Sequence, residues 1–170
     1  MPYTEQEGDL IFDFDHVLNK KDARFETKQI REKTSIQPTD FLLEFANHFS
    51  FVEVKDPDRP NPDNPEKFDS DVKEGNLIRK LAGKFRDSYF LFSHQEREPK
   101  KVRYVVLACR KKFDDAFWLT KSEELQRSIP WKHKSFKNSP LMVCIILSLE
   151  QWKRKFGPES VWRVSEIEDE

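Results

Sequence analysis

The sequence is poor in cysteine and glycine and has no long hydrophobic run. Its two cysteines, Cys109 and Cys144, each lie inside an apolar stretch, which excludes a disulfide framework and a zinc site built on cysteine. The longest apolar run, residues 141–147, is well short of the ~18 residues needed to cross a bilayer. The first nine residues are polar and acidic, unlike a signal peptide. We therefore expect a cytoplasmic protein that does not bind membranes.

Charge and phenylalanine, by contrast, are abundant. Charged residues make up 36% of the chain and it contains 15 phenylalanines, so we expect a packed core rather than disorder. The net charge of −1 hides an asymmetry, because residues 1–75 are strongly acidic and residues 76–158 strongly basic. Either these charges pair across the fold, or the acidic half holds a metal ion and the basic half holds phosphate.

Hydrophobic patterning predicts one α/β domain around a mixed sheet. Alternating or continuous apolar runs predict strands, apolar stripes at helical spacing predict helices, and the prolines of 56–67 predict a stiff surface loop. The expected strands are 10–15, 40–45, 50–55, 102–109 and 142–147, and the expected helices are 70–92, 114–128 and 150–156. This order is typical of an α/β sandwich.

Charged residues at one end of the predicted hairpin indicate a chemical site. Glu53 and Lys55 are two residues apart in a strand and so share a face, and Asp40 begins the antiparallel partner strand at the same edge. Two carboxylates ~4 Å apart repel by roughly 4 kcal/mol at an effective dielectric of 20, and a divalent cation removes this cost. Oxygen ligands suit Mg²⁺ or Mn²⁺, and the Val54 carbonyl can add a backbone ligand. The alternative is a surface hairpin with weak cross-strand ion pairs.

The same residues resemble a known signature. Pro38-Thr39-Asp40 followed by Glu53-Val54-Lys55 is similar to the bipartite motif of the PD-(D/E)xK nuclease superfamily, except that Thr39 separates the proline from the acid. The hairpin, the basic helix and strand 102–109 also resemble the superfamily's core, and residues 10–110 resemble small bacterial proteins placed in it. The resemblance implies a restriction endonuclease-like mixed sheet flanked by helices.

The resemblance also implies a function. It makes the protein a Mg²⁺- or Mn²⁺-dependent nuclease in which a metal-activated water attacks a phosphodiester bond, with DNA as the expected substrate. Asp40 and Glu53 are then the metal ligands and Lys55 the catalytic lysine. Members often carry a further acid on an N-terminal helix, for which Glu26 is the best-placed residue. Glu44, in phase with Asp40 on its strand, is a weaker candidate.

The rest of the chain is expected to complete the same domain. We expect residues 1–170 to form one unit, with a core at about 10–110, a helix–strand extension at 111–158 and a solvated acidic tail at 159–170. Basic residues that could contact a nucleic-acid backbone lie on the predicted helix and in an aromatic-rich stretch. They are Lys80, Lys84, Arg86, Lys132, Lys134 and Lys137. The alternative is a solvated helix face and an exposed loop. A homodimer, or a partner subunit in a defence or repair system, is plausible.

Two other functions stay open. The superfamily includes members that have lost catalysis and only bind nucleic acid or protein. Residues 10–18 resemble the first motif of haloacid dehalogenase-like phosphatases, which would make Asp13 the nucleophile and Asp15 the general acid/base. The later motifs of those phosphatases are missing, however, and four glycines are few for the tight loops of such a site.

Overall fold

The computed structural model describes residues 3–129, 131, 135 and 141–168. No helix in these ranges is both long and apolar enough to span a bilayer. The strands are β1 (Thr4–Glu7), β2 (Leu10–Asp13), β3 (Phe41–Glu44), β4 (His48–Lys55), β5 (Lys101–Ala108), β6 (Leu141–Leu147) and β7 (Val161–Arg163). The helices are η1 (Lys20–Asp22), α1 (Lys28–Lys33), α2 (Pro65–Lys73), α3 (Asn76–Ser93), α4 (Asp115–Ser128), α5 (Leu149–Phe156), η2 (Pro158–Ser160) and α6 (Val164–Glu168).

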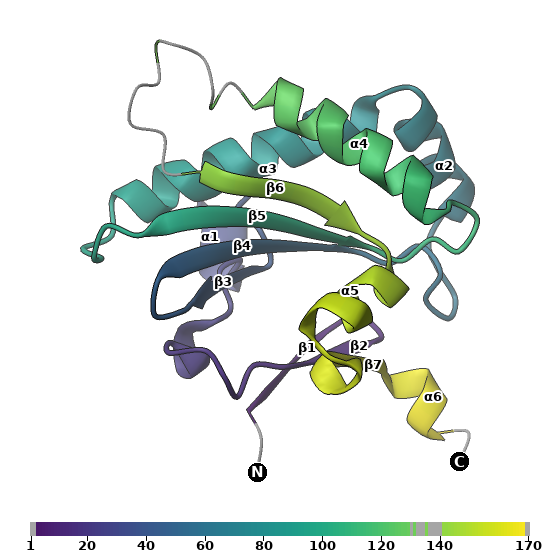
Figure 1. Cartoon of the computed structure of the whole chain (residues 1–170), viewed down its shortest axis with the longest axis horizontal. Coiled ribbons are helices and arrows are strands. Elements are labelled where there is room, and N and C mark those ends of the chain that lie inside the picture. The colour runs from purple at the N-terminus through teal and green to yellow at the C-terminus, as the bar shows by residue number, and fades with distance from the viewer. Residues whose placement is uncertain (1–2, 130, 132–134, 136–140, 169–170) are drawn as a thin grey trace.

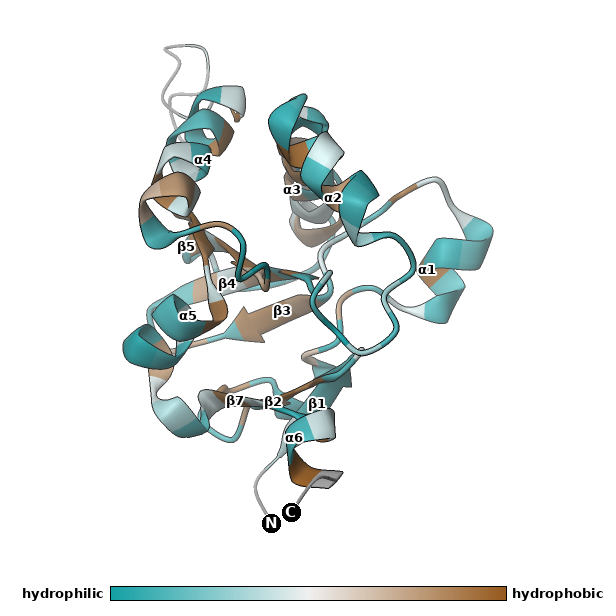
Figure 2. Ribbon diagram, turned by 90° about the vertical axis from the view of Figure 1, so that its right-hand side faces the viewer, coloured by the Kyte–Doolittle hydropathy of each residue, from teal (hydrophilic) through white to brown (hydrophobic). Residues whose placement is uncertain are grey.

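The main sheet has four strands in the order β3-β4-β5-β6. β3 is antiparallel to β4, whereas β5 and β6 run parallel to β4 through crossovers that contain α3 and α4. Both helices cover the same face of the sheet (Figure 1), and the smaller antiparallel sheet β1-β2-β7 lies beyond the other face together with α5 (Figure 2). The predicted α/β class with a mixed sheet is therefore confirmed.

Two apolar cores follow from the alternation of side chains along the central strands. Phe49, Phe51 and Tyr104 point toward α3 and α4, while Val52 and Val105 point toward the small sheet. All five are at most 3% exposed, and fully burying each large apolar side chain stabilises the fold by about 1.5–3 kcal/mol. Strands that are apolar on both faces thus occupy the middle layer.

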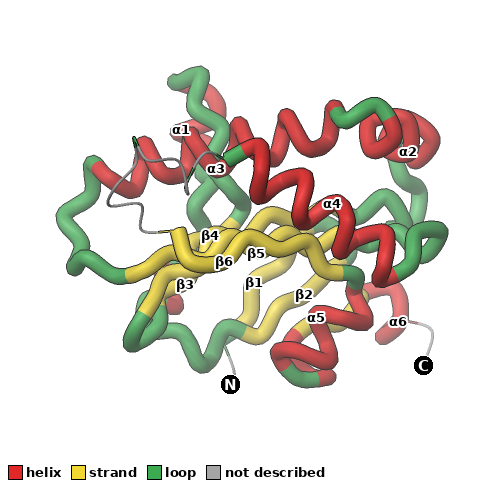
Figure 3. The backbone as a smooth tube through the Cα atoms, turned by 45° about the horizontal axis from the view of Figure 1, so that its top comes forward, coloured by secondary structure: helices red, strands yellow, loops and turns green. Residues whose placement is uncertain are grey.

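Strand β6 is at the edge of the main sheet, and α4 covers that edge. The Ser122 hydroxyl accepts a hydrogen bond from Ile146 N at 2.8 Å, and the Gln126 amide donates to Cys144 O at 2.9 Å. Figure 3 shows α4 crossing above β5 and β6. These side chains satisfy backbone groups that an open edge would expose to other chains. The expectation of a fully buried strand at 142–147 is wrong at Met142, which is 43% exposed.

The predicted helix at 70–92 is two helices. Gly75 separates α2 from α3 with a φ of 74°, a left-handed conformation that glycine adopts at little cost. The proline-rich loop is also shorter than expected, because α2 begins at Pro65. Proline is well tolerated at the first helical position, and the Asn64 side chain caps the helix by accepting a hydrogen bond from Lys67 N at 2.8 Å.

The expectation of a solvated acidic tail at 159–170 is wrong for the part that the structure describes. β7 pairs with β2, which makes β2 the central strand of the small sheet. Arg163 at the end of β7 is buried and contacts both Asp56, at 2.8 Å, and Asp9, at 3.0 Å. An apolar residue, Val161, is fully buried beside it. Composition indicated the acidic surface of this segment but not its partner strand.

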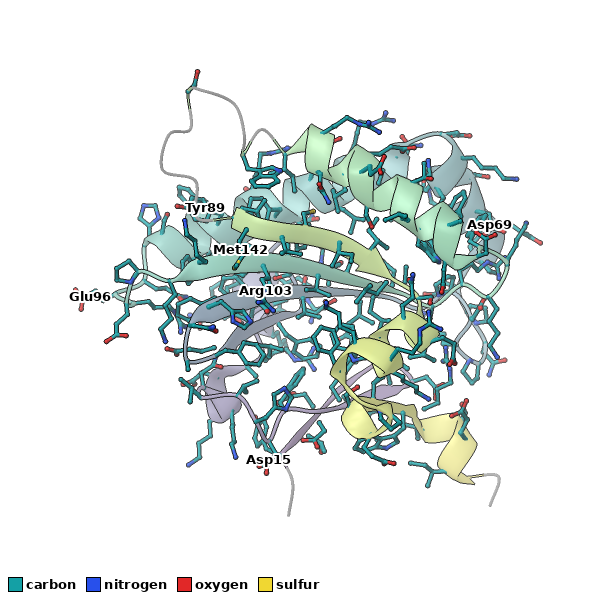
Figure 4. All side chains as sticks on the ribbon, in the orientation of Figure 1. Asp15, Asp69, Tyr89, Glu96, Arg103 and Met142 are labelled. Carbon is teal, nitrogen blue, oxygen red and sulfur yellow. The ribbon has the colours of Figure 1, made fainter. Side chains whose placement is uncertain are left out.

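Much of the charge asymmetry is resolved by pairing between the two halves. Arg110 contacts Asp58 and Asp69, and Lys112 also contacts Asp69, which is labelled in Figure 4. These bonds, led by that from Arg110, lower the pKa of Asp69 to about 2. Further pairs of this kind are Lys80–Asp71, Lys84–Glu53, Arg97–Glu44 and Lys100–Glu44. Many charges of the acidic and basic halves therefore pair with each other across the fold, which is the first of the two alternatives for the charge asymmetry.

Replacing Arg163 with methionine should destabilise the protein by on the order of 3 kcal/mol, because Asp9 and Asp56 would remain buried without their cation. Urea denaturation measures the change. Arg154→Ala is the matched control, since Arg154 and its partner Asp115 are 64% and 49% exposed and such pairs contribute about 0–1 kcal/mol. Equal effects of the two substitutions would show that the Arg163 contacts do not hold β7 in place.

Candidate active site

The segment before β3 is held on helix α3, and this fixes the position of Asp40. The backbone N–H of Thr39 donates to the Ser88 hydroxyl at 2.8 Å, and the Lys84 ammonium contacts the Pro38 carbonyl at 3.3 Å. Lys84 and Ser88 are four residues apart, so they lie on one face of the helix. Pro38, Thr39 and Asp40 are all buried as a result.

The register of the β3–β4 hairpin brings Asp40 beside Glu53. Phe41 pairs with Val52, so one residue further along the same register Asp40 lies opposite Glu53. The backbone N–H of Val54 donates to Asp40 Oδ2 at 2.7 Å, which holds the carboxylate against β4. The sequence-predicted meeting of Asp40 with the Glu53-Val54-Lys55 segment is therefore what the structure contains.

Glu53 is a charged residue in the middle layer of the fold. Its side chain is 0% exposed, and its Oε1 lies 2.6 Å from Lys55 Nζ and 3.1 Å from Lys84 Nζ. A buried carboxylate is tolerated when cations compensate its charge, as the two ammonium groups do here. Neither Glu53 oxygen has a well-aligned hydrogen bond within the described part of the chain, although both ammonium groups lie close to Oε1.

Burial and charge set the protonation of the site. The pKa of Asp40 is raised to about 7, first by burial and then by the negative charge of Glu53, while the Lys84 ammonium opposes both effects. Burial lowers the pKa of Lys55, but the adjacent Glu53 carboxylate outweighs this, so its pKa is raised overall. Near neutral pH the Asp40 carboxyl is thus poised between its two forms, whereas Lys55 keeps its proton.

Two further acids lie near these groups. Glu26 lies two residues before the first residue of α1 rather than on the helix, and its charge contributes to the raised pKa of Lys55. Glu7 in β1 likewise contributes to the raised pKa of Asp40. Glu26 was predicted from the resemblance, whereas Glu7 was missed. No local pattern marks Glu7, because its position depends on the pairing of β1 with β2 and on the ion pair that it forms with Arg24.

Lys84 was predicted for a different role. Its placement on the basic helix face indicated a contact with nucleic acid, but its side chain is only 17% exposed and joins Glu53. The interval of 31 residues between Glu53 and Lys84 carries no recognisable spacing rule. The signal that existed was physical, since a glutamate between apolar strand residues requires a cation from some other element.

Glu44 does not belong to the site. It ends β3, whereas Asp40 precedes the first residue of that strand, and its carboxylate contacts Lys100 at 2.8 Å and Arg97 at 3.9 Å. Glu44 is on the same face of the strand as Asp40, as its spacing predicts, but it lies at the opposite end of β3. This expectation is therefore wrong.

A polar hollow opens beside Lys55. Its volume is about 330 Å³, and the proline-rich loop forms most of its wall. It is lined by Val54, Lys55, Asp56, Pro57, Arg59, Pro62, Asp63, Asn64, Pro65 and Phe68. The Lys55 side chain is 31% exposed and lines this hollow, whereas Asp40, Glu53 and Lys84 are not among its lining residues.

The site has oxygen donors that suit a hard divalent cation. Because backbone groups alternate along a strand, the Val54 carbonyl points to the same side of β4 as its N–H, which is the side of Asp40. Two carboxylates and one carbonyl fit Mg²⁺ or Mn²⁺, which commonly keep several waters. Both Glu53 oxygens lack a well-aligned hydrogen bond among the described residues, so they are available as donors to a cation. No group of three or more His, Cys, Asp or Glu side chains suited to a metal occurs among the described residues, so protein donors alone would not fill the coordination shell.

The other predicted nucleic-acid contacts have ordinary surroundings or fall outside the description. Lys80 is 58% exposed and contacts Asp71 at 2.5 Å. Arg86 is exposed on α3. Lys132, Lys134 and Lys137 lie outside the described residues.

Asp13 and Asp15, the residues of the phosphatase alternative, are engaged in a local turn. Asp13 Oδ1 accepts a hydrogen bond from Asp15 N at 2.8 Å, and Asp15 contacts Lys20 at 2.6 Å, which lowers the pKa of Asp15. Asp15 points away from the main sheet in Figure 4. Asp13 ends β2 of the small antiparallel sheet, and neither Asp13 nor Asp15 lines the hollow beside Lys55.

Replacing Asp40 with asparagine should stabilise the protein above neutral pH by on the order of 3 kcal/mol. The pKa of Asp40 is raised from 3.8 to about 7 in the fold, so ionising it costs stability as the pH rises from about 4 to about 7. The asparagine oxygen can still accept from Val54 N. Denaturation between pH 4 and 9 should show a gain that grows up to about pH 7 and is then constant. A gain that is independent of pH would contradict this account.

Comparisons with protein-family models, with curated proteins and with solved structures found no match. The functional argument therefore rests on the geometry of the site itself.

Proposed function

We propose that this protein is a nuclease that hydrolyses phosphodiester bonds with Mg²⁺ or Mn²⁺ held by Asp40 and Glu53. The observation that carries the proposal is the convergence of Asp40, Glu53 and Lys55 at one edge of the β3–β4 hairpin. These are the residues that the bipartite signature requires, and Val54 joins them through its backbone. DNA is the substrate that we propose.

The arrangement of secondary structure supports the same proposal. A hairpin is followed by helix α3 and then by a strand parallel to the second hairpin strand, which is similar to the core of the PD-(D/E)xK superfamily. Glu26, two residues before helix α1, remains the candidate for the additional acid, although it does not lie on the helix. The departure is that the second face of the sheet is covered largely by a small sheet. The restriction endonuclease-like fold is therefore part of the proposal.

Each residue has a distinct role in the proposed reaction. Asp40, Glu53 and the Val54 carbonyl hold the cation, which when bound supplies a water nucleophile and neutralises charge on the phosphate. Lys55, at the wall of the hollow, stabilises negative charge that develops on the phosphate oxygens. Its raised pKa favours this role over that of a general base, because the ammonium retains its proton near neutral pH.

A second function is favoured by one observation. Lys55 and Lys84 already balance the charge of Glu53, so the site is stable without a metal ion. This is what a catalytically inactive binding module on the same fold would show. In that case the protein would bind nucleic acid or another protein through its surface, and the acids would serve only the structure.

Lys55→Ala should lower metal-dependent cleavage by at least about 100-fold, because it removes the charge that stabilises the transition state. The measurement is cleavage of supercoiled plasmid, single-stranded DNA and single-stranded RNA with Mn²⁺, Mg²⁺ or EDTA. Lys20→Ala is the control, since Lys20 is 40% exposed, pairs with Asp15 and lies outside the site.

Cleavage that Lys55→Ala leaves unchanged would contradict the assigned role of Lys55. A folded wild type that neither cuts any of these substrates nor binds Mn²⁺ would overturn the nuclease and favour the inactive binding module.

A further inference from the structure

Four formally charged groups share the candidate site. When all four are ionised, the charges of the Asp40 and Glu53 carboxylates and of the Lys55 and Lys84 ammonium groups sum to zero. Both ammonium groups contact the same oxygen, Glu53 Oε1. A divalent cation added to this set would leave two uncompensated positive charges in a largely buried place. Such an excess is costly unless an anion arrives with it.

Lys84 is built into the site rather than attached to its rim. Its side chain is 17% exposed, and its ammonium is held between Glu53 Oε1 at 3.1 Å and the Pro38 carbonyl at 3.3 Å. It therefore contacts both parts of the bipartite signature. The backbone of the segment before β3 is fixed to the same helix through Ser88, so Lys84 cannot withdraw without breaking contacts on either side.

We infer that Lys84 acts as an internal cation that weakens metal binding in the free protein and makes the site take its divalent cation together with a phosphodiester anion. This inference rests on the proposed function and adds the order of binding to it. The negative phosphodiester offsets the excess charge that the cation creates. Lys55, which lines the hollow, is the ammonium group that the phosphate oxygens would meet, and Lys84 contacts the same Glu53 oxygen as Lys55.

The coupling must act in both directions. If a phosphodiester tightens the binding of the cation by some factor, the cation tightens the binding of the phosphodiester by the same factor. The free protein would then hold little metal at low concentration and would acquire it with the substrate. If the role of Lys84 were purely structural, its removal would loosen the site and weaken the binding of the metal ion. If Lys84 acts as an internal cation, its removal should tighten that binding.

The experiment measures Mn²⁺ binding by the electron paramagnetic resonance signal of the free ion, without any cleavage assay. Wild type is titrated with Mn²⁺ in dimethyl phosphate, which carries one negative charge, and in neutral trimethyl phosphate at equal ionic strength. The expected result is Mn²⁺ affinity at least about fivefold higher in dimethyl phosphate. Equal affinities in the two solutions would overturn the inference, and this comparison requires no substitution.

Variants of α3 test the role of Lys84 itself. Lys84→Met removes the charge and should tighten Mn²⁺ binding in trimethyl phosphate by at least about fivefold, while the advantage of dimethyl phosphate should shrink. Lys84→Arg keeps the charge and should behave as wild type. Lys80→Met is the matched control one turn away, where the lysine is 58% exposed and pairs with Asp71. Unchanged or weaker Mn²⁺ binding by a folded Lys84→Met protein would overturn the inference.

The two proposals fail in different ways. If wild type binds Mn²⁺ and its cleavage depends on Lys55, but Lys84→Met does not bind Mn²⁺ more tightly, the inference fails and the nuclease stands. If neither wild type nor Lys84→Met binds Mn²⁺ at millimolar concentrations with dimethyl phosphate present, both proposals fail together. A loss of binding in Asp40→Asn, measured alongside, identifies the bound Mn²⁺ as belonging to this site.

Discussion

The buried carboxylate of Glu53 is the constraint on which the rest of the site depends. A glutamate with no solvent exposure in a central strand is unfavourable by itself, and the fold offsets it with ammonium groups from two different elements. Lys55 comes from the same strand and Lys84 from the crossover helix, so β4 and α3 must pack in one relative position. The contacts of α3 with the segment before β3 then set the place of Asp40. The charge of buried Glu53 therefore accounts both for the grouping of the candidate site residues and for the packing of β4, α3 and the segment before β3.

Local patterns were sufficient to predict the hairpin and the residues that it brings together. The aromatic, aliphatic and β-branched content of 40–45 and 50–55, together with the short turn between them, predicts a hairpin in which the start of the first strand faces the end of the second. Asp40 and Glu53 were therefore predictable as neighbours without knowledge of the rest of the fold. The continuous apolar character of 102–109 likewise predicted a central strand, which β5 is.

What sequence reasoning missed depends on contacts between distant segments. In the sequence, Lys84 cannot be distinguished from other basic residues on an exposed helix face. Only the packing of α3 on β4 brings it to Glu53. In the sequence alone, Glu7 belongs to a polar N-terminal segment with no structural signal, and its position is fixed only by the pairing of β1 with β2. The acidic composition of 159–170 concealed Val161 and Arg163, whose burial depends on a strand near the other end of the described chain. The failed expectation for Glu44 had a different origin, since phase along a strand gives the face of a residue but not its distance from another.

The small sheet has a consequence for the order in which the protein folds. β2 pairs with β7, and Asp9 bonds to Arg163 across 154 residues of sequence, so this sheet closes only after nearly all of the described chain has been synthesised. Arg163 also holds Asp56, the residue directly after Lys55. The hairpin can form early from nearby residues, but the segment that leaves it is anchored only when β7 arrives. A nascent chain could therefore form the hairpin that carries Asp40 and Glu53 before Arg163 of β7 anchors Asp56. Any activity that needs both would begin only after synthesis has passed β7.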